Sequence, residues 1–165
     1  MNRQKNTGMT LIEVMVVVAI IGIIVAIAAP SFSTMLENQR IKGAAEAMLT
    51  DLRWARAEAI KRNAPVRVTF ATGSNWSYTI NTFPALTTSD GVLPKTVNGS
   101  DFPSTTLETA SFAGRVAYTT FDPVRGTNLN NGTATITSNN LSAGVKVSTL
   151  GRVRICGSMG GYNAC

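Results

Sequence analysis

The chain has 165 residues, a net charge of +6 and no histidine. The length suits a single domain with one sizeable core, and the absence of imidazole excludes a serine-histidine triad, a cysteine-histidine pair and the common histidine-based zinc sites. Charged residues make up only 15% of the chain, against about 25% in an average protein, and the shortage is greatest near the start. These features argue against a hydrolase or a zinc enzyme.

The first predicted element is an apolar helix near the start of the chain. Residues 14–29 carry no charge, and extending the stretch back to Met9 adds only one, that of Glu13. About twenty such residues span a bilayer as a helix. Arg3 and Lys5 precede the stretch without an acidic residue, so the positive-inside rule keeps the N-terminus in the cytoplasm. We expect a single transmembrane helix over residues 9–29 and a domain outside the cytoplasm over residues 30–165.

Two sites of maturation are compatible with this stretch. Small residues at 26–29 could imitate the A-x-A pattern of an ordinary secretory signal, which is cleaved after its apolar region. Cleavage between Gly8 and Met9 would instead leave the helix on the mature protein. Glu13 favours the second site, because a carboxylate inside hydrocarbon costs several kcal/mol and demands a partner or a purpose. The alternative is that Glu13 lies shallow enough to reach the headgroups.

The segment KNTGMTLIEVMVVVAIIGIIVAIAAPSF closely resembles the N-terminus of type IV pilins and type II secretion pseudopilins. The resemblance implies a leader peptide over residues 1–8 that the inner-membrane prepilin peptidase removes after Gly8, methylating the new amino group of Met9. It also implies that Glu13 neutralises the N-terminus of a neighbouring subunit during filament assembly. Gly22 and Pro30 would weaken the helix. The family usually has Phe where this chain has Met9.

A second helical pattern follows, and then a series of strands. Apolar residues recur every three or four positions from Ile41 to Ala59, which predicts one buried helix face, and Asn63-Ala64-Pro65 ends the helix. A helix followed by many strands indicates an α+β fold. Residues 82–111, rich in Thr, Ser, Pro and Gly, are expected to form loops with one or two short strands. Clear strands are expected at 66–71, 76–81, 115–121, 133–138, 144–149 and 152–156.

The run LRWARAEAIKRNAPVRV (52–68) and the later TTFDPVRGT (119–127) resemble the minor pilin and pseudopilin family that includes FimT of type IV pili and GspH of type II secretion. This resemblance implies a type IV pilin-like fold, in which a long N-terminal helix packs on antiparallel sheets. It also implies other major and minor pilins as partners and assembly into an extracellular pilus. We interpret Trp54, Arg56 and Glu58 of the run as helix packing and surface.

The two cysteines, Cys156 and Cys165, lie close together in the last part of the sequence. In a domain exported to an oxidising compartment they are expected to form a disulfide. The bond would close a short loop and contribute about 2 to 3 kcal/mol. Metal binding by two thiols without histidine is a poor alternative.

The residues after Asp122 include four bases and no acid. Arg152 and Arg154 are two positions apart, so on a strand they emerge from one face at a spacing that suits the phosphates of nucleic acid. The alternative is a solvated basic edge that prevents unwanted strand pairing. The motif Gly151-Arg152-Val153-Arg154 resembles the Gly-Arg-x-Arg with which the FimT branch binds double-stranded DNA for natural transformation. Lys146 is a further candidate contact, whereas Arg115 and Arg125 are interpreted as surface charges.

Three functions follow from these residues. The preferred one is a FimT-like minor pilin that binds DNA without sequence preference, catalyses no reaction and needs no cofactor. The second is a GspH-like minor pseudopilin in tip assembly of the type II protein secretion system. The third is a membrane-anchored periplasmic enzyme using a carboxylate pair from Asp101, Glu108 and Asp122, although nothing in their spacing favours it.

Overall fold

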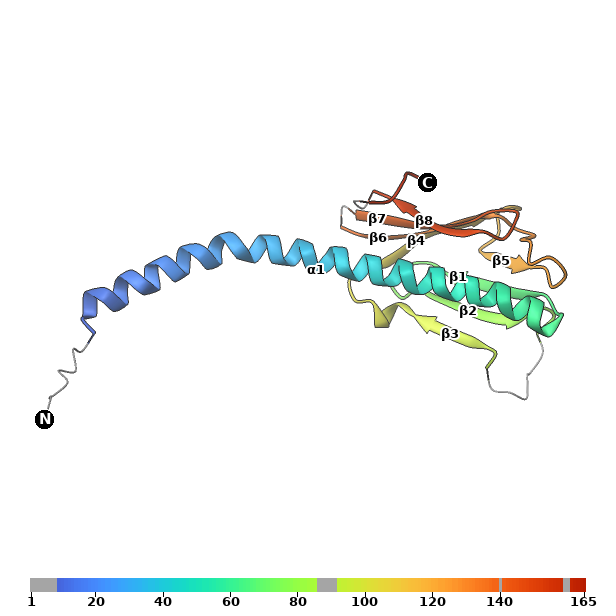
Figure 1. Cartoon of the computed structure of the whole chain (residues 1–165), viewed down its shortest axis with the longest axis horizontal. Helices are drawn as coiled ribbons and strands as arrows, with labels where there is room; N and C mark the ends of the chain where they lie inside the picture. The colour runs from blue at the N-terminus through green and yellow to red at the C-terminus, as the bar shows by residue number, and fades with distance from the viewer. Residues whose placement is uncertain (1–8, 86–91, 140, 159–160) are drawn as a thin grey trace, which may run out of the picture. The chain divides into compact units, whose positions relative to one another are not determined.

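The computed structural model describes residues 9–85, 92–139, 141–158 and 161–165, with the side chains of residues 28–31 excepted. The chain divides into an N-terminal unit, Met1–Leu36, and a globular unit, Glu37–Cys165. The long helix α1 (Leu11–Arg62) contributes to both units. Figure 1 shows the elements of the globular unit, in which the second part of α1 lies along the β-sheets.

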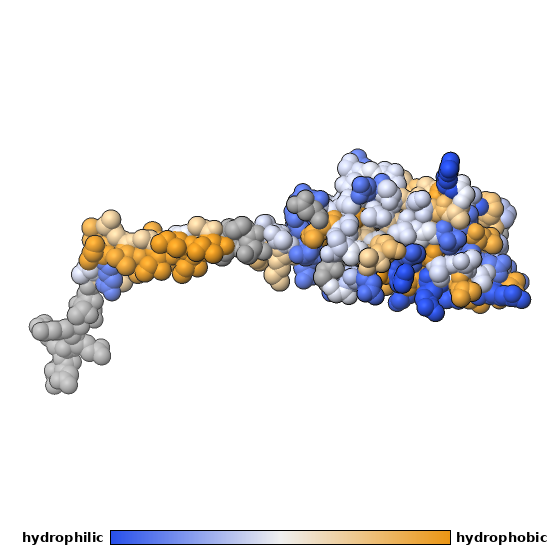
Figure 2. All heavy atoms as spheres, turned by 90° about the horizontal axis from the view of Figure 1, so that it is seen from above, coloured by the Kyte–Doolittle hydropathy of each residue, from blue (hydrophilic) through white to orange (hydrophobic). Residues whose placement is uncertain are grey.

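In the N-terminal unit, α1 is apolar and its described side chains are exposed. It is long and apolar enough to cross a membrane, by length and composition, and it continues as a helix through Gly22 and Pro30. The helix therefore contains no break at the two positions expected to weaken it. Figure 2 shows the apolar side chains as a nearly continuous hydrophobic surface on the visible side of this segment.

Both ends of α1 have recognisable caps. At the start, the backbone N–H of Glu13 donates to the Thr10 hydroxyl at 3.4 Å, which is one half of a capping box of the form Thr-x-x-Glu. At the end, Asn63 adopts a left-handed φ of 50°. The N–H groups of Asn63 and Ala64 then bond back to the carbonyls of Ile60 and Ala59, both at 3.2 Å, as in a Schellman motif. The helix therefore ends at Arg62, directly before the Asn63-Ala64-Pro65 segment predicted to end it.

The globular unit contains two antiparallel sheets of four strands (Figure 1), with strand orders β3-β2-β1-β5 and β4-β6-β7-β8. The expected α+β fold with a long N-terminal helix is confirmed. A short 3₁₀ helix, η1 (Gly99–Asp101), connects β3 and β4. The strands are β1 (Val66–Ala71), β2 (Ser77–Thr82), β3 (Lys95–Asn98), β4 (Thr106–Phe112), β5 (Tyr118–Phe121), β6 (Gly132–Ser138), β7 (Leu141–Val147) and β8 (Val153–Gly157).

The core of the globular unit lies between α1 and the inner faces of both sheets. Alternating residues of β1, β2, β6 and β7 are buried, and Trp76 donates to the Thr105 hydroxyl at 3.1 Å within this core. The Tyr78 hydroxyl donates to Asp51 of α1 at 2.9 Å, which ties the helix to β2. The predicted helical stripe is confirmed: Ile41, Ala45, Met48, Leu52, Ala55 and Ala59 are all fully or almost fully buried.

Several predicted strand boundaries are wrong by a few residues. The strand expected from Arg115 begins instead at Tyr118, because Phe112 to Val116 form a turn in which Arg115 takes a left-handed φ of 56°. The strand expected at 144–149 is β7, which starts at Leu141 and ends at Val147. The segment 82–111 contains β3 and most of β4, as the prediction of one or two strands allowed, and residues 86–91 within it lie outside the described residues.

Candidate nucleic-acid interface

The outer face of the β7–β8 hairpin brings three of the predicted basic residues together. Lys146 pairs in register with Arg154, and Gly144 pairs with Cys156 two residues further along. Because side chains alternate between the faces of a strand, these two pairs share one face, and Arg152 precedes β8 on the same side. Val153 between the arginines is buried while both arginines are exposed, so the expected common face is present.

A tight turn between β7 and β8 positions Arg152. The Arg152 N–H donates to the Ser148 hydroxyl at 3.1 Å, and the Gly151 N–H donates to the Ser148 carbonyl at 2.8 Å. Gly151 is buried and has a φ of +73°, and a Cβ there would lie 2.0 Å from the carbonyl oxygen of Gly126. The left-handed conformation and this close approach together require glycine.

The basic side chains surround a shallow hollow. The hollow has a volume of about 320 Å³ and is lined by Lys146, Ser148, Thr149, Leu150, Arg152 and Arg154. Among the described residues, no carboxylate side chain forms an ion pair with Arg152 or Arg154. Two unpaired guanidiniums beside an ammonium group attract an anionic polymer, and each guanidinium can bind a phosphate through two N–H groups.

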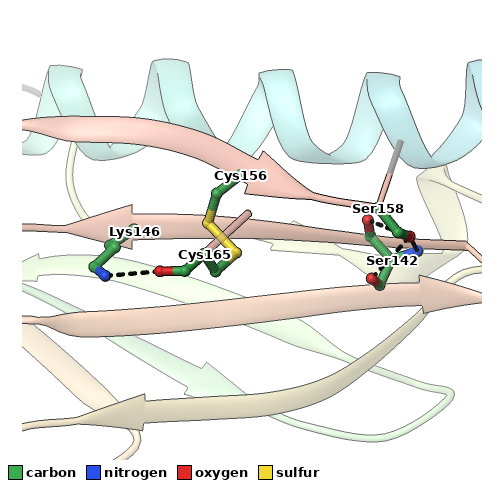
Figure 3. The surroundings of a disulfide bond; sticks show 5 residues. All are labelled: Ser142, Lys146, Cys156, Ser158 and Cys165. Carbon is green, nitrogen blue, oxygen red and sulfur yellow. Dashed lines mark hydrogen bonds between the residues drawn. A yellow bond between two sulfur atoms is a disulfide. The ribbon is translucent and has the colours of Figure 1, made fainter. Parts of the chain in front are cut away.

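The predicted disulfide joins Cys156 and Cys165 on the same face of the hairpin (Figure 3). Its sulfur atoms occupy the space above Gly144, where a Cβ would lie 2.5 Å from the Cys165 sulfur. The bond holds the segment after β8 over the sheet, so that the Cys165 backbone oxygen accepts a hydrogen bond from Lys146 Nζ at 3.0 Å. Lys146 is therefore oriented, and one of its three donors is used.

Two arginines of α1 lie beside the same turn, and analysis of the sequence did not assign them to the site. Arg56 Nε donates to the Gly126 carbonyl at 2.8 Å, and an Arg53 Nη donates to the Val153 carbonyl at 3.4 Å. Both line a second hollow of about 380 Å³ together with Arg152. Their spacing of three on one helix face was the available signal, because it aligns their side chains.

The other two residues of the helical run behave as packing residues. Trp54 is half-buried, and the Lys95 ammonium lies 5.5 Å above its ring. Glu58 is buried and bonds to Arg62 Nε at 2.6 Å and Lys61 Nζ at 3.3 Å. Burial alone would raise the pKa of Glu58, but the hydrogen bonds and charges of Arg62 and Lys61 outweigh burial and lower it.

The remaining predicted residues lie apart from the hairpin in the chain. Gly8 falls outside the described residues. Met9 is exposed just before α1, and Glu13 is exposed in its first turn. Of the three carboxylates considered for catalysis, Asp101 is in η1 and Glu108 in β4, while Asp122 accepts backbone hydrogen bonds in a turn. Within the described ranges, no group of three or more Cys, Asp or Glu could hold a metal ion.

Two protein-family models match this chain, one near its N-terminus and one in the globular unit. The family model "Type II transport protein GspH" matches residues 44–151, and the model "Prokaryotic N-terminal methylation motif" matches residues 3–29. Comparison with curated proteins found no match. Two crystal structures of the type IV minor pilin FimU of Pseudomonas aeruginosa have similar folds, each at 20% sequence identity. One covers 70% of this chain and 91% of FimU with a TM-score of 0.50, and the other 73% and 91% with 0.53.

These matches agree with the geometry described above. The GspH model covers more than half of the chain and includes most of the buried face of α1 and most of both sheets. The methylation motif coincides with the apolar first part of α1, which indicates membrane anchoring and processing by a prepilin peptidase. The fold is that of the type IV minor pilin FimU. The chain therefore belongs to the GspH family of pilin-like proteins.

Proposed function

We propose that this chain is a FimT-like minor pilin that binds extracellular double-stranded DNA for uptake in natural transformation. The supporting observation is the cluster of Lys146, Arg152 and Arg154 on the outer face of the β7–β8 hairpin, where no described carboxylate side chain forms an ion pair with either guanidinium. Gly151 contributes by fixing the turn that presents Arg152.

The chemistry of the cluster favours contact with the DNA backbone over base reading. Its charged groups are donors only, and phosphate contacts carry no sequence information. Binding releases counterions from the DNA, so the affinity falls steeply with salt, by a slope of about 0.9 per phosphate contact. We therefore expect similar affinity for duplexes of different sequence.

A titration of DNA binding against salt tests the interface. The full chain, solubilised in neutral detergent, is titrated with a fluorescent duplex of random sequence over a range of salt concentrations. The double variant Arg152→Gln/Arg154→Gln is expected to lower the salt slope by about 1.8. The matched control is Arg40→Gln/Lys42→Gln, which removes two exposed charges of α1 outside the two hollows. Equal losses in both variants would remove the assignment to the hairpin.

We propose that the apolar helix serves first as an inner-membrane anchor and then as the core of the pilus. Cleavage after Gly8 would leave Met9 as the methylated N-terminus, and Glu13 would neutralise the N-terminus of a neighbouring subunit. Two opposite charges inside an apolar bundle stabilise each other only as a pair. The observed capping bond uses the backbone N–H of Glu13. In a complete capping box the Glu side chain would also accept from the Thr10 N–H, which would be a second, purely local role for this position.

Two substitutions of Glu13 separate the assembly role from the capping role. Glutamine can replace glutamate in a capping box but carries no charge. Alanine can neither complete the capping box nor carry a charge. We expect both Glu13→Gln and Glu13→Ala to abolish incorporation into pili, measured by immunoblotting of sheared filaments, while membrane levels stay unchanged. Normal incorporation of the Gln variant would show that only the cap matters.

The alternative function is that of a GspH-like minor pseudopilin in tip assembly of the type II secretion system. The match to the model described as a type II transport protein over residues 44–151 supports it. A deletion strain distinguishes the two functions, because a DNA-uptake pilin is required for transformation and a pseudopilin for exoprotein export. Genes of type II secretion on either side of the coding sequence would also favour the alternative.

A further inference from the structure

The second hollow, beside α1, has the composition of an anion site. Residues 151–153 of the hairpin line it together with four residues of α1, Arg53, Arg56, Ala57 and Ile60. Arg152 lines this hollow and also the first one. The two hollows are therefore neighbours that share one lining residue, and none of the residues lining either of them is acidic.

The arginines of α1 are already held in place. Arg56 is half-buried, and its Nε bond to Gly126 uses one of the five N–H groups of the guanidinium. Arg53 is exposed, and its bond to Val153 likewise uses one donor. No described carboxylate side chain pairs with either residue. Each guanidinium keeps N–H donors for a ligand. The backbone carbonyls already orient each side chain, so less side-chain entropy is lost when a ligand binds.

We infer that this hollow is a second phosphate-binding site, so that the DNA backbone passes from the β7–β8 face across Arg152 onto α1. The inference rests on the proposed function, because the ligand is the same polymer. Two adjacent phosphate sites on one chain act together, since a phosphate bound at the first raises the effective concentration of the next at the second. The interface then includes helix residues that the Gly-Arg-x-Arg motif does not contain.

Ala57 allows a test that removes no existing contact. It is exposed, lines the hollow and directly follows Arg56 along α1. Ala57→Glu would place a carboxylate four residues after Arg53, where the two side chains can pair. Ala57→Lys would add a positive charge, and Ala57→Gln would add a polar side chain without charge. The matched controls are Gln39→Glu and Gln39→Lys, at an exposed position about 27 Å earlier on the helix, well beyond the screening length of about 8 Å.

The measurement is the affinity of the full chain in neutral detergent for a random duplex, with circular dichroism spectra to verify folding. At 0.1 M salt one phosphate contact contributes about eightfold. We expect Ala57→Glu to lose about that factor and to lower the salt slope by about 0.9, and Ala57→Lys to raise both. Ala57→Gln and both Gln39 variants should bind like the wild type.

The outcomes separate this inference from the proposed function. If the wild type binds and the Arg152/Arg154 double variant does not, but Ala57→Glu binds as well as Gln39→Glu, the second site is refuted and the proposed function stands. If the wild type does not bind DNA, both are refuted. If Ala57→Gln weakens binding as much as Ala57→Glu, the effect is steric and the phosphate site is refuted.

Discussion

Substitution of Gly151 tests how the turn between β7 and β8 supports the basic face. Alanine at this position meets two separate obstacles. The residue has a φ of +73°, where a Cβ is strained, and the added atom would lie 2.0 Å from the Gly126 oxygen and 3.0 Å from Arg56 Nε. A backbone oxygen cannot rotate away as a side chain can, so the two turns must separate.

The free-energy cost follows from these contacts. A non-glycine residue in the left-handed region costs about 1 to 2 kcal/mol. Separating the turns also breaks the hydrogen bond between Arg56 and Gly126, which costs about 1 to 3 kcal/mol when a half-buried group loses its partner. The total of about 2 to 5 kcal/mol corresponds to about 7 to 18 °C in Tm for a folding unit of this size.

Gly114 provides the matched control, because it has a φ of +88° and nothing within 4 Å of an added Cβ. Gly114→Ala should show the conformational cost alone. Urea unfolding of the full chain in detergent, followed by tryptophan fluorescence, measures both variants, and DNA titration should show weakened binding only for Gly151→Ala. Equal destabilisation by the two substitutions would show that the close approach to Gly126 does not matter.

Three further predictions concern the packing around the site. The pKa of Glu58 is lowered in the folded state, so its contribution to stability is complete well above pH 4.5 and is lost as the pH falls through that lowered value. The free energies of urea unfolding of Glu58→Gln and the wild type should therefore differ at pH 7 and converge in acid. Replacing Cys156 and Cys165 by serine should cost about 2 to 3 kcal/mol by the loop-closure estimate, seen in denaturant unfolding without reductant. Tyr78→Phe should cost about 1 to 3 kcal/mol in the same assay, because Asp51 would lose a buried donor.

The fold was predictable wherever a short periodic pattern decides it. The buried stripe of α1 appears in the sequence as apolar residues three and four apart, and the alternation in Val66–Ala71 matches β1 in full. Predicted strand boundaries were wrong where one residue takes an unusual conformation, as Arg115 does in its turn. The division into two sheets could not be predicted from the sequence. β5 pairs with β1 while β4 pairs with β6, and this strand pairing depends on packing across the whole domain.

The candidate site was predictable in its local part only. The period of a strand was enough to place Arg152 and Arg154 on one face. The pairing of Lys146 with Arg154 depends on the register of the hairpin, which the sequence pattern does not specify. The contribution of Arg53 and Arg56 depends on the packing of α1 beside the turn at Gly151. A contact between residues 56 and 126 has no signal in either segment alone.

The apolar first part of α1 restricts how a subunit can travel. Fourteen large hydrophobic side chains between Met9 and Ile27 are exposed. At about 1.5 kcal/mol or more for each side chain, full hydration of this segment is unfavourable by on the order of 20 kcal/mol. A free monomer in water is therefore negligible in concentration. Any exchange of this subunit between a bilayer and an assembled fibre must be a direct lateral transfer, in which lipid contacts are replaced one by one by contacts with other helices.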